Sequence, residues 1–504
     1  MKPSIPLSSV WISLSIMGSL LVAFVGGVGP HDYWWHLAMG RRFSQSGHIP
    51  DTNLFLYTRP LDEPFFNQPW LGQWLMYQMH EWGGPIIGLI FLSLSCLIFA
   101  LILLKTFKDV KLDPRLASVI TFLALTVCKP IFSVRTRMFA ILPMLLITHL
   151  LFKYQRGKST AKSLFWIPPL IVFWANTHGS FVVGVMMTWL LFADRLLLTF
   201  GVGVREELET RASLKHVTLL AIASTLAGCV HPYGIKVYTY VLELAIFSNV
   251  ATTVTEWRPP SIQEGIGVFV LILVLLCLAL LFRFRKALSI FTVLMCALGI
   301  YLGVSAQRSL LFFGIILPFA LAPFLGELVP KKEEERATTV ESFINGTLIL
   351  GLTVMLFLSF PLFRPQTLID FFPPTRRGAP GAGVFSDGNI SPTIVARSKR
   401  VFHAQGIGGQ IEWIFDGPAA FVDQRMEYIP QSVWDEYYVV SKAKKGWSKV
   451  LEKYEIDTLI LLKKEHANLV KALLDSKQYY HDHAQDEGPY VVFRSFDRFE
   501  NPLK

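Results

Sequence analysis

The chain has 504 residues, of which 52% are hydrophobic and only 17% are charged, and its mean hydropathy is +0.44. This composition excludes an ordinary soluble globular protein and indicates a polytopic membrane protein. The net charge of +10 would suggest nucleic-acid binding in a soluble chain, but much of the excess lies in short loops between apolar segments. Such loops orient a protein in a membrane, so we expect no nucleic-acid partner.

Eleven apolar runs predict about eleven membrane-spanning helices. Their approximate ranges are 9–29, 84–104, 116–132, 138–152, 163–177, 180–200, 216–230, 266–282, 287–304, 308–328 and 342–363. The first run lacks a small-residue cleavage site, so we expect a retained span and not a signal peptide. The five cysteines of the chain have no CxxC partner, so they indicate neither a zinc site nor a disulfide framework.

Basic residues cluster in the loops that lie on the same side as Lys2. They are Lys105, Lys108, Lys111, Arg115, Lys153, Arg156, Lys158, Lys162, Arg205, Arg211, Lys215, Arg283, Arg285, Lys286, Lys331, Lys332 and Arg336. Because cytoplasmic loops carry an excess of lysine and arginine, the N-terminus is predicted to be cytoplasmic. An odd number of spans then places the C-terminus outside the plasma (inner) membrane.

The predicted organisation is a transmembrane domain, 1–363, followed by an extracytoplasmic domain, 364–504. Two long outer loops, 30–83 and 231–265, belong to the transmembrane domain. The second loop contains an amphipathic stretch that we expect to lie on the membrane.

The first outer loop opens with DYWWHLAMGRRF, in which Asp32, Trp35 and His36 would share one face of a helix. Gly47 can cap this helix in the left-handed conformation, and Pro50 bars its continuation. A second helix is predicted from Trp70, where tryptophan and tyrosine alternate with leucine and methionine. Both helices are expected to lie in the membrane interface.

The tail alternates short apolar runs with helical stretches, which predicts a small α/β domain. The expected strands are 419–423, 456–462 and 490–496, and the expected helices are 432–446 and 463–477. The tail contains no GxGxxG or Walker-type phosphate loop, and no cysteine or HExxH motif for zinc.

Asp32 could act as a general base that removes a proton from an acceptor hydroxyl, and an anionic partner or partial burial would raise its pKa for that role. The alternative is that Asp32 only begins and caps a helix, where an acid is favoured by the exposed amides and the helix dipole. Spacing does not separate the two.

Four cations lie at the outer boundary, against the orientation bias: Lys129, Arg135, Arg137 and Arg308. Binding of a lipid-linked phosphate or pyrophosphate would explain these cations, because arginine pairs well with phosphate oxygens. For any single residue, snorkelling to lipid headgroups is the alternative.

Three further outer residues are candidates for a sugar or acceptor pocket. His178 could donate a hydrogen bond to substrate, or be a structural turn residue beside Gly179. Glu256 and Trp257 could supply an acid and a stacking ring, or terminate a surface helix. Asp194 and Arg195 are interpreted as a local ion pair.

Several motifs are spread from one end of the chain to the other. They are DYWWHLAMGRRFSQSGHIPDTNLFLYT, QPWLGQWL, WANTHGSFVVG, HPYG, EWRPP, AQRSLLFF, GGQIEWIF and AAFVDQRMEYI. In these motifs the chain resembles the GT-C superfamily of integral membrane glycosyltransferases, and most of all a prokaryotic group of GT-C-like membrane proteins. The superfamily includes protein mannosyltransferases and aminoarabinose transferases.

The resemblance implies a GT-C-like transmembrane fold with two interfacial helices in the first outer loop and a polyprenyl-phosphate sugar as donor. It also implies that Asp32 is the catalytic base, and it makes Arg308 a weaker match for a contact to the donor phosphate. The chain departs from the group where it has Thr136 after Arg135 and Ser180 after the WANTHG turn. It has a single acid where protein mannosyltransferases have an Asp-Glu pair, which argues against a protein acceptor.

The sequence therefore predicts an inverting glycosyltransferase, metal-independent or weakly assisted by a divalent metal. Its partners would be a polyprenyl-phosphate-linked sugar, membrane lipids, and a glycan, lipid or protein acceptor. Arg308, Arg135, Arg137 and Lys129 would bind the donor phosphate, and Trp34, Trp35, His36, His178, Glu256 and Trp257 would shape the pocket. The competing hypothesis is a non-catalytic membrane scaffold or glycolipid-binding subunit of an envelope glycan system. A transporter is a third, disfavoured because the spans contain few isolated charges.

Overall fold

A computed structural model describes residues 4–26, 30–202, 213–246, 255–331, 336–359, 398–486 and 489–498. The chain divides into two compact units. One unit, here called the helical unit, comprises Met1–Gly27 and Ile87–Leu368. The other, here called the α/β unit, comprises Val28–Ile86 and Ile369–Lys504. The predicted boundary at 363/364 and part of the predicted outer loop 231–265 lie outside the described residues.

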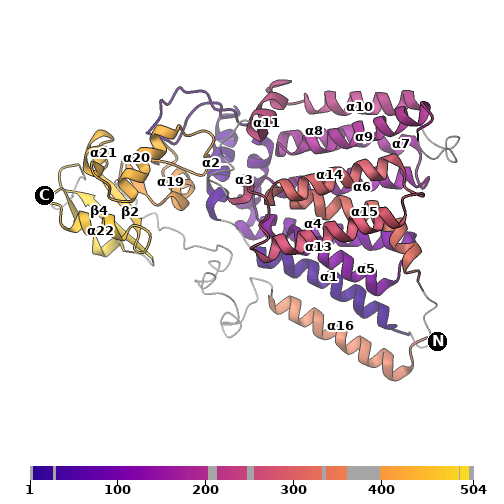
Figure 1. Ribbon diagram of the computed structural model, residues 1–504. Coiled ribbons are helices and arrows are strands. Elements are labelled where there is room, and N and C mark those ends of the chain that lie inside the picture. The colour runs from indigo at the N-terminus through magenta and orange to yellow at the C-terminus, as the bar shows by residue number, and fades with distance from the viewer. Residues whose placement is uncertain are drawn as a thin grey trace. The chain divides into compact units, whose positions relative to one another are not determined.

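Each of the eleven predicted apolar runs forms a helix, and these helices lie side by side in Figure 1. They are α1 (Leu7–Gly26), α4 (Pro85–Asp109), α5 (Pro114–Cys128), α6 (Met138–Gln155), α8 (Ile167–Thr177), α9 (Phe181–Thr199), α10 (Leu214–Gly228), α13 (Gly265–Arg283), α14 (Ile290–Ser305), α15 (Leu310–Leu328) and α16 (Thr339–Ser359). Within the described ranges, eight helices are long and apolar enough to cross a membrane. The helices α8, α10 and α14 are shorter, so the count of eleven spans stays a prediction.

The helical unit is packed around α15, which is buried along most of its length, whereas α13 and α16 expose most of theirs. Small residues allow the close approach that membrane helices use in place of a hydrophobic driving force. A Cβ at Gly314 in α15 would lie 2.5 Å from the Sγ of Cys128 in α5. A Cβ at Gly303, near the end of α14, would clash with Phe313 of α15. The turn between α14 and α15 is therefore held firmly, and it carries Arg308.

The first loop contains the two predicted helices, α2 (Pro30–Ser46) and α3 (Trp70–Gly83), packed against each other. Gly40 permits this approach, because a Cβ there would lie 2.7 Å from the Cβ of Tyr77. Gly47 follows α2 with φ +69°, as the sequence predicted for a left-handed cap.

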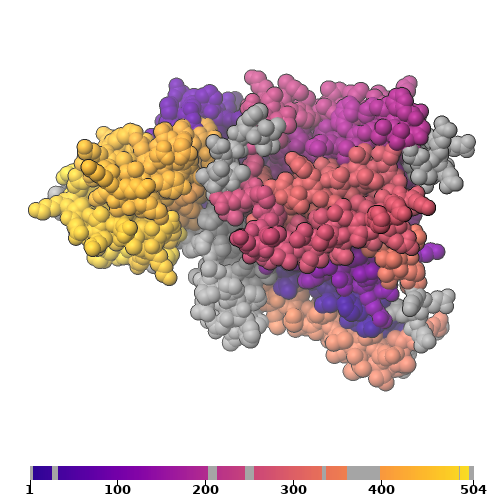
Figure 2. Space-filling model, viewed as in Figure 1, coloured from indigo at the N-terminus to yellow at the C-terminus, as the bar shows by residue number. Residues whose placement is uncertain are grey.

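The described part of the tail is the predicted α/β fold, seen in Figure 2 as a closely packed orange and yellow body. Its sheet has the order β1-β2-β4-β3, with β1 parallel to β2 and the other pairs antiparallel. The strands are β1 (Val401–His403), β2 (Thr458–Leu462), β3 (Tyr479–His481) and β4 (Tyr490–Ser495). The helices are α19 (Gly408–Phe415), α20 (Gln431–Ser441), α21 (Trp447–Lys453) and α22 (Ala467–Leu474). The strands predicted at 456–462 and 490–496 and both predicted helices are confirmed.

The strand predicted at 419–423 is wrong. Ala420 makes only isolated bridges, to Val401 on one side and to Leu56 on the other. The next backbone N–H, that of Phe421, donates to the His403 ring at 3.2 Å and not to a neighbouring strand. A side chain thus interrupts the ladder after one residue, although the segment is apolar and buried as a strand would be.

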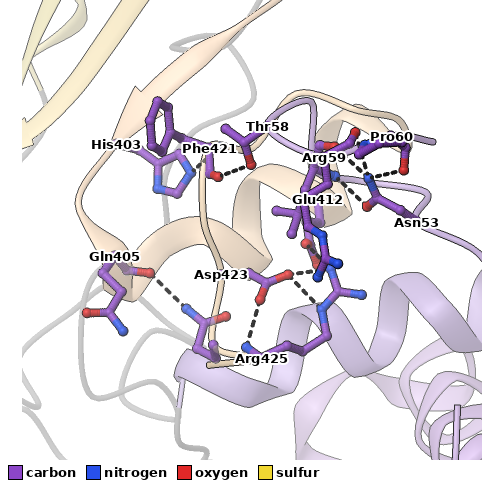
Figure 3. Close-up of polar contacts among 12 residues, drawn as sticks. Asn53, Thr58, Arg59, Pro60, His403, Gln405, Glu412, Phe421, Asp423 and Arg425 are labelled. Atoms are coloured by element: carbon purple, nitrogen blue, oxygen red, sulfur yellow. Dashed lines mark hydrogen bonds and ion pairs between the residues drawn. The ribbon is translucent and has the colours of Figure 1, made fainter. Parts of the chain in front are cut away.

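The connector between α2 and α3 packs into the tail, which the sequence did not reveal. Leu56 belongs to the same apolar core as the sheet. The backbone N–H of Ala420 donates to the carbonyl oxygen of Phe55 at 3.1 Å. The Thr58 hydroxyl donates to the carbonyl of Phe421 at 2.8 Å (Figure 3). The tail and the first loop are therefore one folded unit.

Candidate functional site

Asp32 lies in the first turn of α2, which begins at Pro30. Proline suits the first helical position, because its missing N–H would have no partner there. A carboxylate in this turn faces the positive end of the helix dipole, so Asp32 suits the start of a helix. Asp32 is half-buried. Its role as a base stays a prediction.

Trp34 packs within an aromatic group of the α/β unit. Its ring lies 5.3 Å from Tyr33, 6.0 Å from His80 and 5.9 Å from Trp413, measured between ring centroids. The Tyr33 hydroxyl and His80 Nδ1 are 2.9 Å apart. Burial raises the pKa of Tyr33 and lowers the pKa of His80, so both groups are neutral near pH 7. Trp34 is 8% exposed, so α2 is anchored through this ring.

Trp35 and His36 lie next to each other, with ring centroids 3.8 Å apart. His36 is buried, whereas Trp35 is half-buried. Trp35 packs against a small apolar core formed by Ala38, Met39, Phe55 and Phe65. Both residues were predicted to be pocket walls. In this position only the exposed part of Trp35 is compatible with that role.

Two arginines of α2 fix the end of α19, and the sequence analysis missed them. Arg41 lies 4.1 Å over the Trp413 ring and donates to the Trp413 carbonyl at 2.7 Å. Arg42 forms an ion pair with Asp416 at 2.9 Å, and Asp416 ends α19 in the left-handed conformation. The signal in the sequence was the pair of arginines on an otherwise aromatic helix.

Glu412, Asp423 and Arg425 form a fully buried ion cluster (Figure 3). Arg425 Nε donates to Asp423 Oδ2 at 2.7 Å, and Nη2 donates to Glu412 Oε1 at 2.8 Å. Burial raises the pKa of the Glu412 carboxyl well above its ordinary value. Burial acts in the same direction on Asp423, but the Arg425 guanidinium outweighs it and holds the pKa of that carboxyl below its ordinary value. Burial therefore favours the protonated form of Glu412, which reduces the net charge of the cluster.

In the helical unit, the structure brings together Arg135, Arg137 and Glu256, which are about 120 residues apart in sequence. Arg135 Nη2 donates to Glu256 Oε1 at 2.5 Å, and Arg137 Nη2 donates to Glu256 Oε2 at 3.0 Å. Burial alone would raise the pKa of the Glu256 carboxyl, but the two guanidinium groups bring it down to about 2. Glu256 is therefore ionised at neutral pH. Its ion pairs join the segment that holds Arg135 and Arg137 to the predicted outer loop 231–265.

Arg308 joins this group from the turn between α14 and α15. Its guanidinium carbon lies 3.8 Å over the Trp257 ring, and the Gln307 N–H donates to the Arg258 carbonyl at 2.9 Å. Lys129 is exposed on the 3₁₀ turn η1 (Lys129–Ile131), which contacts the 3₁₀ turn η4 (Gln307–Ser309). The term "basic cluster" is used below for Arg135, Arg137, Glu256, Trp257 and Arg308.

The basic cluster is an unfavourable arrangement of like charges. Burial, followed by the neighbouring charge of Arg135 and then by that of Arg308, lowers the pKa of Arg137 to about 9, although Glu256 acts in the opposite direction. Several guanidinium groups thus face one carboxylate. An anion with more charge and more acceptor oxygens than a carboxylate, such as a phosphate, would balance them better.

His178 lies in the turn after α8 and makes local contacts there. Its Nδ1 lies 2.7 Å from the Ser180 hydroxyl and accepts from the Ser180 N–H at 3.2 Å. The Trp174 indole donates to the same hydroxyl at 3.1 Å. These contacts fit the structural alternative, and a contact of His178 with substrate stays a prediction. Asp194 and Arg195 form the expected ion pair, 3.9 Å apart.

No protein-family model matches the sequence, and no curated protein matches it either. Solved structures match its fold at low sequence identity. An arabinofuranosyltransferase AftD from mycobacteria matches at 11% identity over 96% of this chain and 40% of that chain, with a TM-score of 0.47. ArnT from Cupriavidus metallidurans matches at 14% identity over 98% of this chain and 99% of that chain, with a TM-score of 0.45.

The oligosaccharyltransferase of Archaeoglobus fulgidus, in its apo form, matches with a TM-score of 0.53 at 10% identity. The similarity covers 94% of this chain and 73% of that chain. At this identity the match concerns the fold and not the activity. The chain therefore has the fold of a GT-C membrane glycosyltransferase, as the sequence resemblance implied.

Proposed function

We propose that this chain is an integral membrane glycosyltransferase, which moves a sugar from a polyprenyl-phosphate donor to an acceptor hydroxyl on the extracytoplasmic face. The observation that carries the proposal is the basic cluster, in which Arg135, Arg137 and Arg308 come together in a helical membrane unit. The fold shared with an oligosaccharyltransferase supports it. The excess of basic residues on the side of Lys2 supports a cytoplasmic N-terminus and an extracytoplasmic C-terminal region.

The basic cluster binds the donor phosphate. The guanidinium groups of Arg135 and Arg137 now engage both oxygens of Glu256. The donor is a phosphodiester, which offers the planar forks one negative charge and two terminal oxygens, as Glu256 does. The polyprenyl phosphate that leaves is a monoester with a second charge and a third terminal oxygen, so the arginines favour it over Glu256. The Trp257 ring stabilises the Arg308 guanidinium through a cation–π contact. The exposed Lys129 adds long-range attraction for an anionic lipid.

The transfer inverts the configuration of the sugar. The acceptor oxygen attacks the anomeric carbon while the bond from that carbon to the phosphate oxygen breaks, and the polyprenyl phosphate leaves with an additional negative charge. The arginines stabilise the charge on the leaving phosphate. Asp32 takes the proton from the acceptor hydroxyl. The exposed part of Trp35 contributes to the sugar and acceptor pocket.

A divalent metal was a second option for activating the donor. Among the described residues, Asp32 does not belong to any group of three histidine, cysteine, aspartate or glutamate side chains whose ligand atoms could share a metal ion. A contribution of a divalent metal to donor activation stays a prediction.

Replacing Asp32 tests the proposal. Asp32→Asn keeps the shape of the side chain but removes the base, so transfer should fall by about 10²- to 10⁴-fold. The measurement is transfer of label from a panel of radiolabelled polyprenyl-phosphate hexoses and pentoses to acceptors in membranes that contain the full-length protein.

Asp62→Asn is the matched control, because Asp62 is an exposed acid in the same loop. It should transfer at the wild-type rate. Near-normal transfer by Asp32→Asn, at equal expression and equal thermal stability, would remove Asp32 as the base.

The alternative is a non-catalytic scaffold or glycolipid-binding subunit of an envelope glycan system. The observation that favours it is the firm anchoring of α2 by buried Trp34 and by Arg41, which is typical of a rigid support. A scaffold would bind polyprenyl phosphate through the basic cluster and show no Asp32-dependent transfer with any donor of the panel.

A further inference from the structure

Two histidines and an aspartate come together at the edge of the sheet in the α/β unit. They lie in the segment HDHAQD, residues 481–486, which begins with the last residue of β3 and runs toward β4. The ligand atoms of His481, His483 and Asp486 all lie within 4.8 Å of one another. In the described part of the chain, this is the one group of three such side chains close enough to share a metal ion.

The sheet fixes two of these side chains. His481 ends β3 opposite Phe493 of β4, and its ring stacks on that phenylalanine with centroids 4.9 Å apart. Asp486 Oδ1 accepts a hydrogen bond from the Val492 N–H of β4 at 3.1 Å. Contacts of this kind around the ligands orient them and favour metal binding. The positions of His481 and Asp486 are thus set before any ion arrives.

The nearby charges leave Asp486 available as a ligand. The intervening aspartate, Asp482, is engaged by Arg494, whose Nε donates to Asp482 Oδ2 at 2.6 Å. Asp486 pairs instead with His481, whose Nε2 lies 3.0 Å from its Oδ2. The third member, His483, is exposed, and its ring lies 3.6 Å from that of His481 between centroids. An ion can therefore reach the group from solvent.

We infer that His481, His483 and Asp486 form a binding site for a zinc-class divalent transition metal. Two neutral imidazoles and one carboxylate are a donor set that Zn²⁺ prefers, with water in the fourth position. The metal would replace the contact between His481 and Asp486 and tie β3, the following turn and β4 together. Neither of the zinc patterns considered from the sequence, cysteine pairs or HExxH, covers this arrangement. The inference is independent of the proposed transfer reaction.

Metal titration of the full-length protein tests the inference. After chelation and removal of the chelator, the purified protein is titrated with Co²⁺ and Zn²⁺, and uptake is followed by the visible absorption of Co²⁺ and by calorimetry. We expect about one equivalent to bind, with displacement of Co²⁺ by Zn²⁺ and a rise in the thermal unfolding midpoint. Mg²⁺ should have no such effect, because it prefers oxygen ligands.

The variants distinguish a built site from scattered surface binding. His483→Asn removes an exposed ligand without disturbing a core and should weaken binding at least tenfold, as should Asp486→Asn. His48→Asn removes an exposed histidine of the first loop and should leave binding unchanged. Wild-type protein that binds no Co²⁺ or Zn²⁺, or binding that His483→Asn does not weaken, would overturn the inference and leave a simple ion pair between His481 and Asp486.

Discussion

Arginines and carboxylates meet in both units of the molecule, but in opposite proportions. In the α/β unit one arginine, Arg425, lies between the carboxyls of Glu412 and Asp423, and all three are buried. In the helical unit, Arg135 and Arg137 share the single carboxylate of Glu256. In the first arrangement burial favours the protonated form of one carboxyl, so the charges come close to balance, whereas the second concentrates positive charge.

If the proposed function is right, this difference separates a structural cluster from a binding cluster. A buried group that is charge-balanced has nothing further to attract, and it is retained because breaking it leaves an uncompensated charge. The basic cluster is partly exposed and lies on turns at helix ends. The charges of Arg135 and Arg308 both lower the pKa of Arg137. An incoming anion relieves that repulsion. The comparison predicts that mutations in the two clusters affect different properties.

The largest effect is expected in the buried cluster. Arg425→Met keeps the volume of the side chain but leaves Asp423 charged and unpaired in the core, which should cost about 3–5 kcal/mol of unfolding free energy. The measurement is the thermal unfolding midpoint and the protease resistance of the protein in detergent. Lys453→Met, which removes an exposed partner of Glu436, is the control and should cost less than about 1 kcal/mol. Equal stability of the two variants would refute a structural role for Arg425.

A pH effect of similar origin is expected at His403, which is fully buried beside this cluster. The contacts fit a neutral ring, with Nδ1–H donating to the Ala404 carbonyl at 2.9 Å and Nε2 accepting from the Phe421 N–H at 3.2 Å. Burial lowers the pKa of His403 to about 4. The unfolded chain takes up a proton near the ordinary value of about 6.5, whereas the folded protein does not until pH is about 4.

The contribution of His403 to the free energy of unfolding is therefore complete above about pH 6.5. About 3 kcal/mol of it is lost as pH falls to about 4. Glu256 behaves differently: because its pKa is about 2, its ion pairs persist through this range and are lost only at lower pH.

The test of the His403 prediction is the unfolding midpoint between pH 7 and pH 4 for the wild type and for His403→Gln. The variant should be less stable at pH 7 and should lose less stability on acidification. Parallel curves would show that His403 does not titrate as stated.

The site residues that the sequence identified are mainly residues whose type is unusual for their position. Positive residues on the outer side, such as Arg135 and Arg308, contradict the orientation rule and so drew attention before their positions were known. The length of the apolar runs predicted the helices of the helical unit, and short apolar runs between helical stretches predicted β2 and β4. The Glu412–Asp423–Arg425 cluster was missed because its members are charged residues inside apolar runs, and only folding shows that they meet. The strand at 419–423 failed for a related reason, since a buried histidine ring took the place of a backbone acceptor.

The smallest and most specific effect is expected at Arg308. Arg308→Gln removes one charged contact to the donor phosphate, which is worth about 1.5–3 kcal/mol, so kcat/KM for the polyprenyl-phosphate donor should fall by about 10- to 150-fold. The unfolding midpoint should change little, because Arg308 is half-buried on a turn and its ring partner, Trp257, remains. Arg115→Gln, an exposed arginine on the predicted cytoplasmic side, should change neither quantity.

Retained donor use after Arg308→Gln, together with a large loss of stability, would place the basic cluster in the same class as the Arg425 cluster. In that case the contrast between the two units would be one of burial only. A loss of donor use at unchanged stability has the opposite meaning. It would mean that Arg308→Gln affects donor use whereas Arg425→Met affects stability, so the two clusters act independently. The excess of arginine over carboxylate would then be what makes the cluster in the helical unit a binding site.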